Sequence, residues 1–425
     1  MFFIDSEEKK KWLLEGRFGL EMEGLRVDEN GYLAHTPHPF PDSEYIVRDF
    51  CENQTEINTK AEDSPAQAVE ALGNFKRELL AGLSEQQEKE YLWPFSNPPY
   101  IRSEEDVPVA QFNGNEFSKT AYRQYLSERY GRYKMAFSGI HVNYSFHEEL
   151  LKREYEESGK CDYSEYKSGV YLKLAEQVAA YGWILTAVTA ASPVMDSSFV
   201  EKGKCGGDVF WGIASVRCSE LGYWNYFVPV FDYTSLAGYV DSIRQYIDKK
   251  WIQAPSELYY PVRVKPAGEN RLENLQQKGI NHIELRMFDL NPLAACGVDE
   301  RDVEFAGLLL AWLAAIPGES LTEEEQVQAV QNFKNAAHYD LKTVKIVMPG
   351  DRVATVVDAA LEVLSQMEAF YQEYPAWVRD NLAFQKDKFL DAENRYAWKI
   401  RKEYGVDYVK RGMELARRNQ VEADV

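Results

Sequence analysis

Alternation of apolar and polar residues marks several strands in the first 300 positions. In segment 137–146, Ile140, Val142 and Tyr144 alternate with polar residues such as His141, the period of a strand with one buried face. The strands predicted in this way cover 17–26, 45–58, 137–146 and 283–290. Asn30-Gly31 follows the first of them, and Asn-Gly between extended runs favours a hairpin turn at 28–31. Segment 214–223 is predicted to be a strand followed by a turn.

Helical spacing of apolar residues predicts the remaining elements. The predicted helices cover 6–14, 66–83, 117–130 and 165–190, and almost all of the chain from Asp302 to the end. The longest uncharged stretch, 177–195, contains Thr, Ser and Pro and is close to the minimum length of a membrane span, so we interpret it as a buried helix followed by a turn. Strands separated by long irregular or helical stretches favour an antiparallel sheet with helices on one face. We therefore expect one large α+β unit with a helical C-terminal part.

Composition narrows the classes of function. With 425 residues, 45% of them hydrophobic, the chain can bury a large core, which excludes disorder. The 48 Lys and Arg against 68 Asp and Glu give a net charge of −20, which disfavours binding to nucleic acid or to a membrane surface. The five cysteines include no CxxC pair, and the first stretch is acidic and lacks the apolar core of a signal peptide. We therefore expect a reduced, cytoplasmic protein.

Glycines are concentrated in segment 201–212. Their spacing matches neither the P-loop pattern nor GxGxxG, so P-loop and Rossmann nucleotide folds lose their main support.

The polar faces of the predicted strands are rich in glutamate. They carry Glu21, Glu23, Glu52, Glu56 and Glu284, with His141 among them. If these strands share one sheet, the carboxylates converge, raise one another's pKa and destabilise the fold unless cations lie between them. Carboxylates with a supporting imidazole are ligands that Mg²⁺ or Mn²⁺ accept. We therefore expect a divalent-metal cleft, with an acidic face exposed to solvent as the alternative.

Four arginines lie in or beside the same segments, where Tyr and Gly are frequent: Arg123, Arg217, Arg263 and Arg286. Arginine makes planar bidentate contacts to carboxylate or phosphate. A metal and arginines in one cleft are typical of phosphoryl transfer, although each arginine alone also fits an ordinary ion pair.

Six segments in fixed order give a more specific signal. The chain resembles the bacterial glutamate-cysteine ligases (gamma-glutamylcysteine synthetases) through GLEMEGLR (19–26), DFCENQTE (49–56), SGIHVNYS (138–145), SVRCSELGY (215–223), ELYYPVR (257–263) and IELRMFDLNP (283–292). The resemblance spans about residues 12–300, and residues 301–425 carry no matched block.

The resemblance implies a fold, a domain organisation and a reaction. The fold is of the glutamine-synthetase-like kind, a curved antiparallel sheet forming a funnel and packed with helices, in one catalytic domain over 1–425. ATP would phosphorylate the gamma-carboxylate of glutamate, and the amine of cysteine would then attack the acyl phosphate. The partners are small-molecule substrates, and we expect a monomer.

The resemblance also assigns roles to individual residues. The magnesium shell (Mn²⁺ being an alternative ion) would be Glu21, Glu23, Asp49, Glu56, His141 and Glu284. Arg286 and Arg263 would contact ATP phosphates, and Asn143 and Arg217 would hold glutamate and the transferred phosphoryl group. The cysteine-binding residues would be Phe50, Tyr122, Arg123, Tyr223 and Tyr259. Arg217, Glu284 and Arg286 are the predicted catalytic residues.

Two features depart from this pattern. Asp49 and Glu56 are seven residues apart and would face opposite ways on one straight strand, so sharing a site requires a bend or bulge. Met135 stands where the family commonly has Gln, and alternation places it on the same side as His141. A thioether cannot replace an amide's donors, so Met135 is interpreted either as a packing residue or as a lost hydrogen bond to the amino-acid substrate.

Three alternatives to glutamate-cysteine ligation stay open. The first keeps the ligase chemistry and changes the acceptor to another small amino acid or amine. The second is a non-catalytic acidic binding domain on the same scaffold. The third is a metal-dependent phosphohydrolase.

Overall fold

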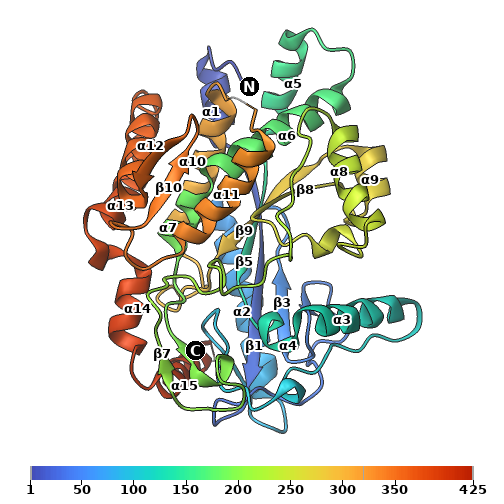
Figure 1. The fold of residues 1–425 in the computed structure, drawn as a ribbon, viewed down its shortest axis with the longest axis vertical. Helices are drawn as coiled ribbons and strands as arrows, with labels where there is room; N and C mark the ends of the chain where they lie inside the picture. The colour runs from blue at the N-terminus through green and yellow to red at the C-terminus, as the bar shows by residue number, and fades with distance from the viewer. Residues whose placement is uncertain (1, 319, 424–425) are drawn as a thin grey trace.

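An antiparallel sheet forms the centre of the molecule (Figure 1), a computed structural model that describes residues 2–318 and 320–423. Its strands follow the order β2-β3-β1-β5-β9-β8, and β4 pairs with β1. The bounds are β1 (Arg17–Val27), β2 (Ile46–Arg48), β3 (Gln54–Asn58), β4 (Tyr91–Leu92), β5 (Ile140–Ser145), β8 (Val262–Lys265) and β9 (His282–Phe288). Two small hairpins lie outside this sheet, β6 (Met195–Asp196) with β7 (Asp208–Val209) and β10 (Lys345–Met348) with β11 (Arg352–Thr355).

Helices surround the sheet and make up most of the C-terminal part. They are α1 (Glu7–Leu14), α2 (Pro65–Ser84), α3 (Phe117–Tyr130), α4 (Arg132–Met135), α5 (Glu148–Ser158), α6 (Tyr163–Tyr181), α7 (Trp183–Thr189), α8 (Leu236–Asp248), α9 (Leu272–Lys278), α10 (Glu300–Ala315), α11 (Glu323–Ala336), α12 (Val356–Phe370), α13 (Ala376–Leu390), α14 (Tyr396–Tyr404) and α15 (Tyr408–Ala423). Several begin at the expected caps: Ser6 caps α1, and Thr322 and Glu325 form a capping box on α11.

The apolar face of the sheet packs against helices. Phe18, Leu20 and Met22 of β1 are buried in the largest hydrophobic cluster, together with apolar residues of β5, β9, α6, α7 and α10. Every residue of α7 is buried. Within the described ranges, no helix is long and apolar enough to cross a membrane. The helices of this cluster thus cover one face of the sheet, and the polar side chains of the same strands project from the other.

The predicted α+β class, with an antiparallel sheet and a largely helical C-terminal part, is confirmed. Residues 424–425, which end the predicted helical region, lie outside the described residues. Helix 165–190 is divided into α6 and α7 at Gly182, where a side chain would meet Val178 and Phe333.

Three local predictions were wrong. Segment 45–58 forms β2 and β3 with a turn between them. Segment 214–223 forms turns instead of a strand, because side chains such as Ser215 and Ser219 bond the backbone there. The hairpin β10–β11 interrupts the predicted helical region, since Gly350 and Asp351 both have positive φ, as a tight hairpin turn requires.

Met135 also lies in a different element from the one predicted. It ends the short helix α4, five residues before β5 begins, so strand alternation does not relate it to His141. Its side chain is 8% exposed and belongs to a hydrophobic cluster with Phe50 and Tyr259. This environment favours the interpretation of Met135 as a packing residue.

Candidate active site

The register of the sheet aligns polar residues from four strands. Glu21 of β1 lies opposite His141 of β5, and Glu284 of β9 lies between Asn143 of β5 and Arg263 of β8. These residues occupy alternate positions, so they share the face that the helices of the largest cluster do not cover. Carboxylates far apart in the sequence therefore converge with an imidazole and with cations.

His141 stands at the centre of the carboxylates. Its Nδ1 is 2.9 Å from Glu21 Oε2 and 3.9 Å from Glu284 Oε1, and its Nε2 is 3.7 Å from Glu23 Oε1. One ligand atom from each of Glu21, His141 and Glu284 lies within 4.8 Å of the other two. A carboxylate–imidazole set at this spacing can hold a divalent cation.

The protonation of His141 suits a metal ligand. Burial, together with the charge of Arg286, lowers the pKa of His141 to about 4, so the imidazole is neutral near pH 7. The short contact to Glu21 places the single N–H on Nδ1. The buried Nε2 then keeps its lone pair, and it has no hydrogen-bond partner among the described residues. An orphaned nitrogen facing Glu23 is the form of histidine that coordinates a metal.

The carboxylates fall into two electrostatic groups. Burial opposes the ionisation of Glu21, but the hydrogen bond with His141 outweighs it and lowers the pKa of Glu21 to about 2. Burial and the charge of Asp49 raise the pKa of Glu23 to about 8 and raise the pKa of Glu56 well above its usual range. The pKa of Asp49 is also raised, chiefly by burial. Neighbouring charges of the protein therefore compensate the first group, whereas in the second group the nearby arginines do not offset burial and mutual repulsion.

A tight turn resolves the spacing of Asp49 and Glu56. β2 and β3 pair antiparallel, with Val47 opposite Glu56, and the Asp49 amide donates to the Gln54 carbonyl at 3.1 Å. The chain therefore reverses direction between the two acids. The predicted bend exists, but it is a hairpin turn and not a bulge within one strand.

Three cations surround Glu284. Lys265 Nζ is 3.2 Å from Glu284 Oε1, Arg286 Nη1 is 3.3 Å from the same oxygen, and Arg263 Nη1 is 3.8 Å from Oε2. Burial would raise the pKa of Glu284, but these cations outweigh it and hold the pKa well below the usual range. Sequence reasoning missed Lys265, although the alternation Val262-Arg263-Val264-Lys265 places it on the same side as Arg263.

Arg217 reaches the site from a loop. Its side chain is 6% exposed, its Nη1 donates to the Phe288 carbonyl at 3.3 Å, and its Nε has no partner among the described residues. A Cβ at Gly139 would lie 2.3 Å from the Arg217 Cζ. Glycine at 139 therefore gives the guanidinium room to lie against the start of β5.

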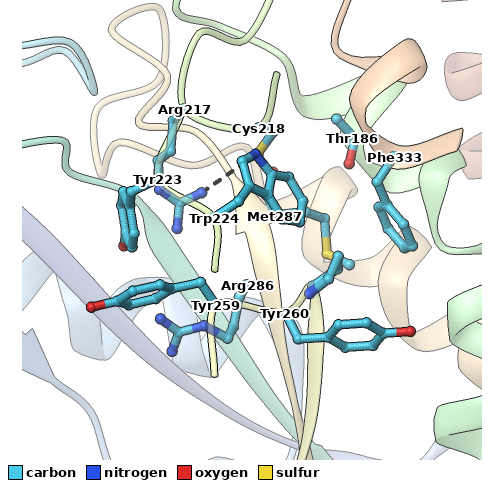
Figure 2. A pocket seen from close by; sticks show the side chains of 11 residues that line it. Thr186, Arg217, Cys218, Tyr223, Trp224, Tyr259, Tyr260, Arg286, Met287 and Phe333 are labelled. Carbon is cyan, nitrogen blue, oxygen red and sulfur yellow. Dashed lines mark hydrogen bonds between the residues drawn. The ribbon is translucent and has the colours of Figure 1, made fainter. Parts of the chain in front are cut away.

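Arg217 and Arg286 line a small cavity of about 50 Å³ with Tyr223 and Tyr259 (Figure 2). The rings of Tyr223 and Tyr259 meet edge to face, with centroids 4.8 Å apart. The predicted cysteine-binding residues Phe50 and Tyr122 belong to the same hydrophobic cluster as these two tyrosines but do not line this cavity.

Two of the predicted substrate residues lie apart from the cavity of Figure 2. The Arg123 guanidinium lies 4.8 Å from the ring centroid of Phe112, and its Nε donates to the Asp49 carbonyl. Asn143 donates to Glu21 Oε1 at 2.8 Å and lines a different cavity, so the structure does not bring it beside Arg217.

This second cavity measures about 550 Å³ and lies beside the carboxylates. Its lining includes Gly19, Glu21, Asn143, Lys167, Lys265 and His282. Glu21 and Lys265 thus connect the carboxylate cluster with a polar cavity, while Arg286 connects it with the tyrosines. The candidate site has two compartments with the acidic and imidazole groups between them.

Comparisons with known proteins bear on the family and the fold of the chain. A family model described as glutamate-cysteine ligase matches residues 1–253 and 227–336. The chain is 33% identical over 379 residues to a glutathione biosynthesis bifunctional protein of Clostridium perfringens, covering 86% of this chain and 48% of that protein. A protein of the same description from Listeria monocytogenes is 32% identical over 417 residues, covering 94% and 54%. The chain spans about half the length of these curated relatives.

Solved structures show the same fold. A glutamate–cysteine ligase from Francisella tularensis, solved in complex with AMP, superposes with a TM-score of 0.87 at 24% identity, covering 96% of this chain and 89% of that one. A bifunctional glutathione synthetase from Pasteurella multocida superposes with a TM-score of 0.83 at 24% identity, covering 98% and 54%.

Proposed function

The chain belongs to the glutamate-cysteine ligase family, and from this premise we propose that it joins the gamma-carboxylate of glutamate to the amino group of cysteine at the expense of ATP. The observation that carries the proposal is the carboxylate–imidazole cluster of Glu21, His141 and Glu284 beside Arg286 and Arg263. Such a cluster, with its cations, is suited to holding a nucleotide's phosphates against an acceptor.

The two compartments suit different substrates. The larger cavity, with Lys167, Lys265 and Asn143 in its lining, has the volume of a small-molecule site and suits a nucleotide. The Francisella tularensis ligase was solved with AMP, which supports nucleotide use by this chain. We assign the amino-acid substrates to the side of Arg217, Tyr223 and Tyr259.

The proposed reaction has two steps. The gamma-carboxylate oxygen of glutamate attacks the terminal phosphorus of ATP, forming an acyl phosphate and releasing ADP. The amine nitrogen of cysteine then attacks the acyl carbon, the C–O bond to phosphate breaks, and the amine proton passes to solvent. Arg217 and Arg286 neutralise charge on the transferred phosphoryl group and on the leaving phosphate.

The metal assignment rests on this chain's own donors. Glu21, Glu23, His141 and Glu284 would hold Mg²⁺ or Mn²⁺, with Asp49 and Glu56 completing the acidic shell. Such an ion neutralises charge on phosphoryl oxygens. The neutral His141 and the uncompensated carboxylates Glu23 and Glu56 fit a cation at this position.

Cysteine is the proposed acceptor because the tyrosines at the substrate side offer ring edges, against which a polarizable sulfur packs well. Another small amine is the alternative. We further propose a single catalytic domain that acts as a cytoplasmic monomer; the five cysteines form no disulfide, which suits a reducing setting.

A nucleotide-release assay tests the proposed function. ADP is measured with ATP, Mg²⁺, glutamate and a panel of amines that includes cysteine and serine. A ligase releases ADP only when glutamate and an amine are both present, and we expect a higher kcat/KM with cysteine than with serine. Phosphate release without an amine would identify a phosphohydrolase, and binding without turnover would identify an acidic binding domain.

A further inference from the structure

Two distant stretches of the chain meet beside the substrate compartment. One is the segment 223–259, which carries the lining residues Tyr223 and Tyr259 and includes the short 3-10 helix η4 (Pro255–Glu257). The other is α3, whose Tyr130 packs on Tyr259. These stretches are more than 90 positions apart. The geometry of the compartment therefore depends on what joins them.

Glu257 forms the centre of the junction. The residue is 0% exposed, and its Oε1 accepts from the Tyr130 hydroxyl at 2.8 Å and from the Tyr125 hydroxyl at 3.2 Å. Arg129 Nε lies 3.1 Å from the same oxygen, while Oε2 accepts from the Gln253 amide at 2.6 Å. Three side chains of α3 thus converge on one buried carboxylate of η4.

The partners of Glu257 connect directly to the tyrosines of the compartment. Tyr130 packs edge to face on Tyr259 at 5.2 Å, and Tyr259 packs in the same way on Tyr223 at 4.8 Å. The neighbouring Ser256 hydroxyl donates to the Tyr122 hydroxyl at 2.9 Å. A shift of η4 relative to α3 would therefore move Tyr122, Tyr223 and Tyr259 relative to one another.

We propose that Glu257 is a positioning residue for the amine acceptor: by anchoring α3 to η4 it sets the spacing of the tyrosines against which the acceptor packs. The proposal rests on the proposed function, because it takes this compartment to be the acceptor side. Glutamate phosphorylation depends on the carboxylate cluster and its arginines. Arg263 donates to the backbone carbonyls of Ser256 and Leu258, on either side of Glu257, but no bond joins the cluster or its arginines to the Glu257 carboxylate among the described residues. Loss of the anchor should therefore weaken acceptor binding selectively.

Steady-state kinetics of the whole chain test this role. Glu257→Gln keeps the shape of the side chain and removes the charge that Arg129 and the two tyrosines share. We expect the KM for cysteine to rise about five- to tenfold, while the KM for glutamate and kcat change less than about twofold. Asp302→Asn is the matched control, since Asp302 is 2% exposed and bonds to Lys388 and Gln385 on α13. It should lower stability and leave the KM for cysteine unchanged.

Equal increases in the KM for glutamate and for cysteine, or an equal effect of Asp302→Asn, would overturn the proposal. If Glu257→Gln does not fold, Tyr125→Phe tests the proposal in its place, because this substitution removes only one hydrogen bond to Glu257. A selective rise in the cysteine KM of about twofold supports the anchor, and an unchanged KM overturns it. If the unmodified chain forms no product with cysteine, the proposed function itself is wrong, and the proposed role of Glu257 is then wrong as well.

Discussion

Glu23 of β1 and Glu56 of β3 lie directly opposite each other in the sheet. Burial and the charge of Asp49 raise the pKa of both carboxyls, that of Glu23 to about 8. Like charges placed opposite each other on neighbouring strands destabilise a sheet. The pair is therefore a local cost to folding that a bound divalent cation would relieve.

Glutamine at Glu56 and at Glu284 should change stability in opposite directions when Mg²⁺ is absent. Because the pKa of the Glu56 carboxyl is raised in the folded chain, folding must either protonate this carboxyl or bear its repulsion. Glu56→Gln removes that cost and should raise the free energy of unfolding by about 1 kcal/mol. Glu284→Gln leaves Lys265, Arg263 and Arg286 without their buried partner and should lower it by about 3 kcal/mol. Urea denaturation in EDTA at pH 8 measures the free energy of unfolding of both variants. Changes of the same sign would contradict the division of the carboxylates into two electrostatic groups.

The stability of the metal-free protein should fall as pH rises toward 8. An unfolded glutamate ionises near pH 4.3, whereas Glu23 in the folded chain stays protonated up to about pH 8. Its raised folded pKa therefore contributes stability that is complete below about pH 4.3 and is lost between that value and about pH 8. Melting temperatures in EDTA at pH 6, 7 and 8 should decrease, and the increase produced by Mg²⁺ should grow over the same range.

Glu23→Gln is the control for this titration. Without the carboxyl, the variant should show a weaker decline between pH 6 and 8 than the unmodified chain. A decline of equal size in both proteins would assign the pH dependence to other groups.

Gly139→Ala should impair catalysis without unfolding the protein. The new methyl group would lie 2.3 Å from the Arg217 Cζ and must displace the guanidinium. We expect kcat to fall about a hundredfold, which corresponds to the loss of one preorganised donor at the phosphoryl group. Gly169→Ala, in α6 with no atom within 4 Å of the added carbon, is the matched control and should keep full activity. Equal activity of the two variants would remove Arg217 from the reaction.

Met135→Gln should not restore a substrate contact. The side chain is packed among aromatic residues such as Phe50 and Tyr133, where an amide lacks partners. The substitution should lower the free energy of unfolding by about 1–3 kcal/mol and leave the KM for glutamate unchanged. Met135→Leu, a volume-conserving change, should cost less than about 1.5 kcal/mol. A glutamate KM several-fold lower in Met135→Gln would show instead that position 135 contacts the donor acid.

Strand alternation was sufficient to identify the residues at the centre of the candidate site. It placed Glu21, His141 and Glu284 on the polar face of three strands, and the structure pairs these strands in register. The alternation of Arg263 and Lys265 with Val262 and Val264 held the same information for a fourth strand. Periodicity is local, so it could identify the face but not the neighbours of each strand.

Periodicity failed where side chains replaced regular backbone pairing. The turn between Asp49 and Gln54 lies inside a run that alternates like one strand, and Met135 lies in a helix of only four residues. Glu257 gave no signal of its own, because the tyrosines and the arginine that it binds lie on α3, more than 120 positions away. Contacts of this kind depend on tertiary packing and not on spacing along the chain.

Oxygen transfer from glutamate to phosphate tests the central claim most directly. The chain is incubated with ATP, Mg²⁺, cysteine and glutamate labelled with ¹⁸O in its gamma-carboxylate, and the products are weighed by mass spectrometry. Attack on ATP through a carboxylate oxygen predicts gamma-glutamylcysteine that has lost one label and inorganic phosphate that carries it. Phosphate without label, or the absence of gamma-glutamylcysteine, would contradict ligation through an acyl phosphate.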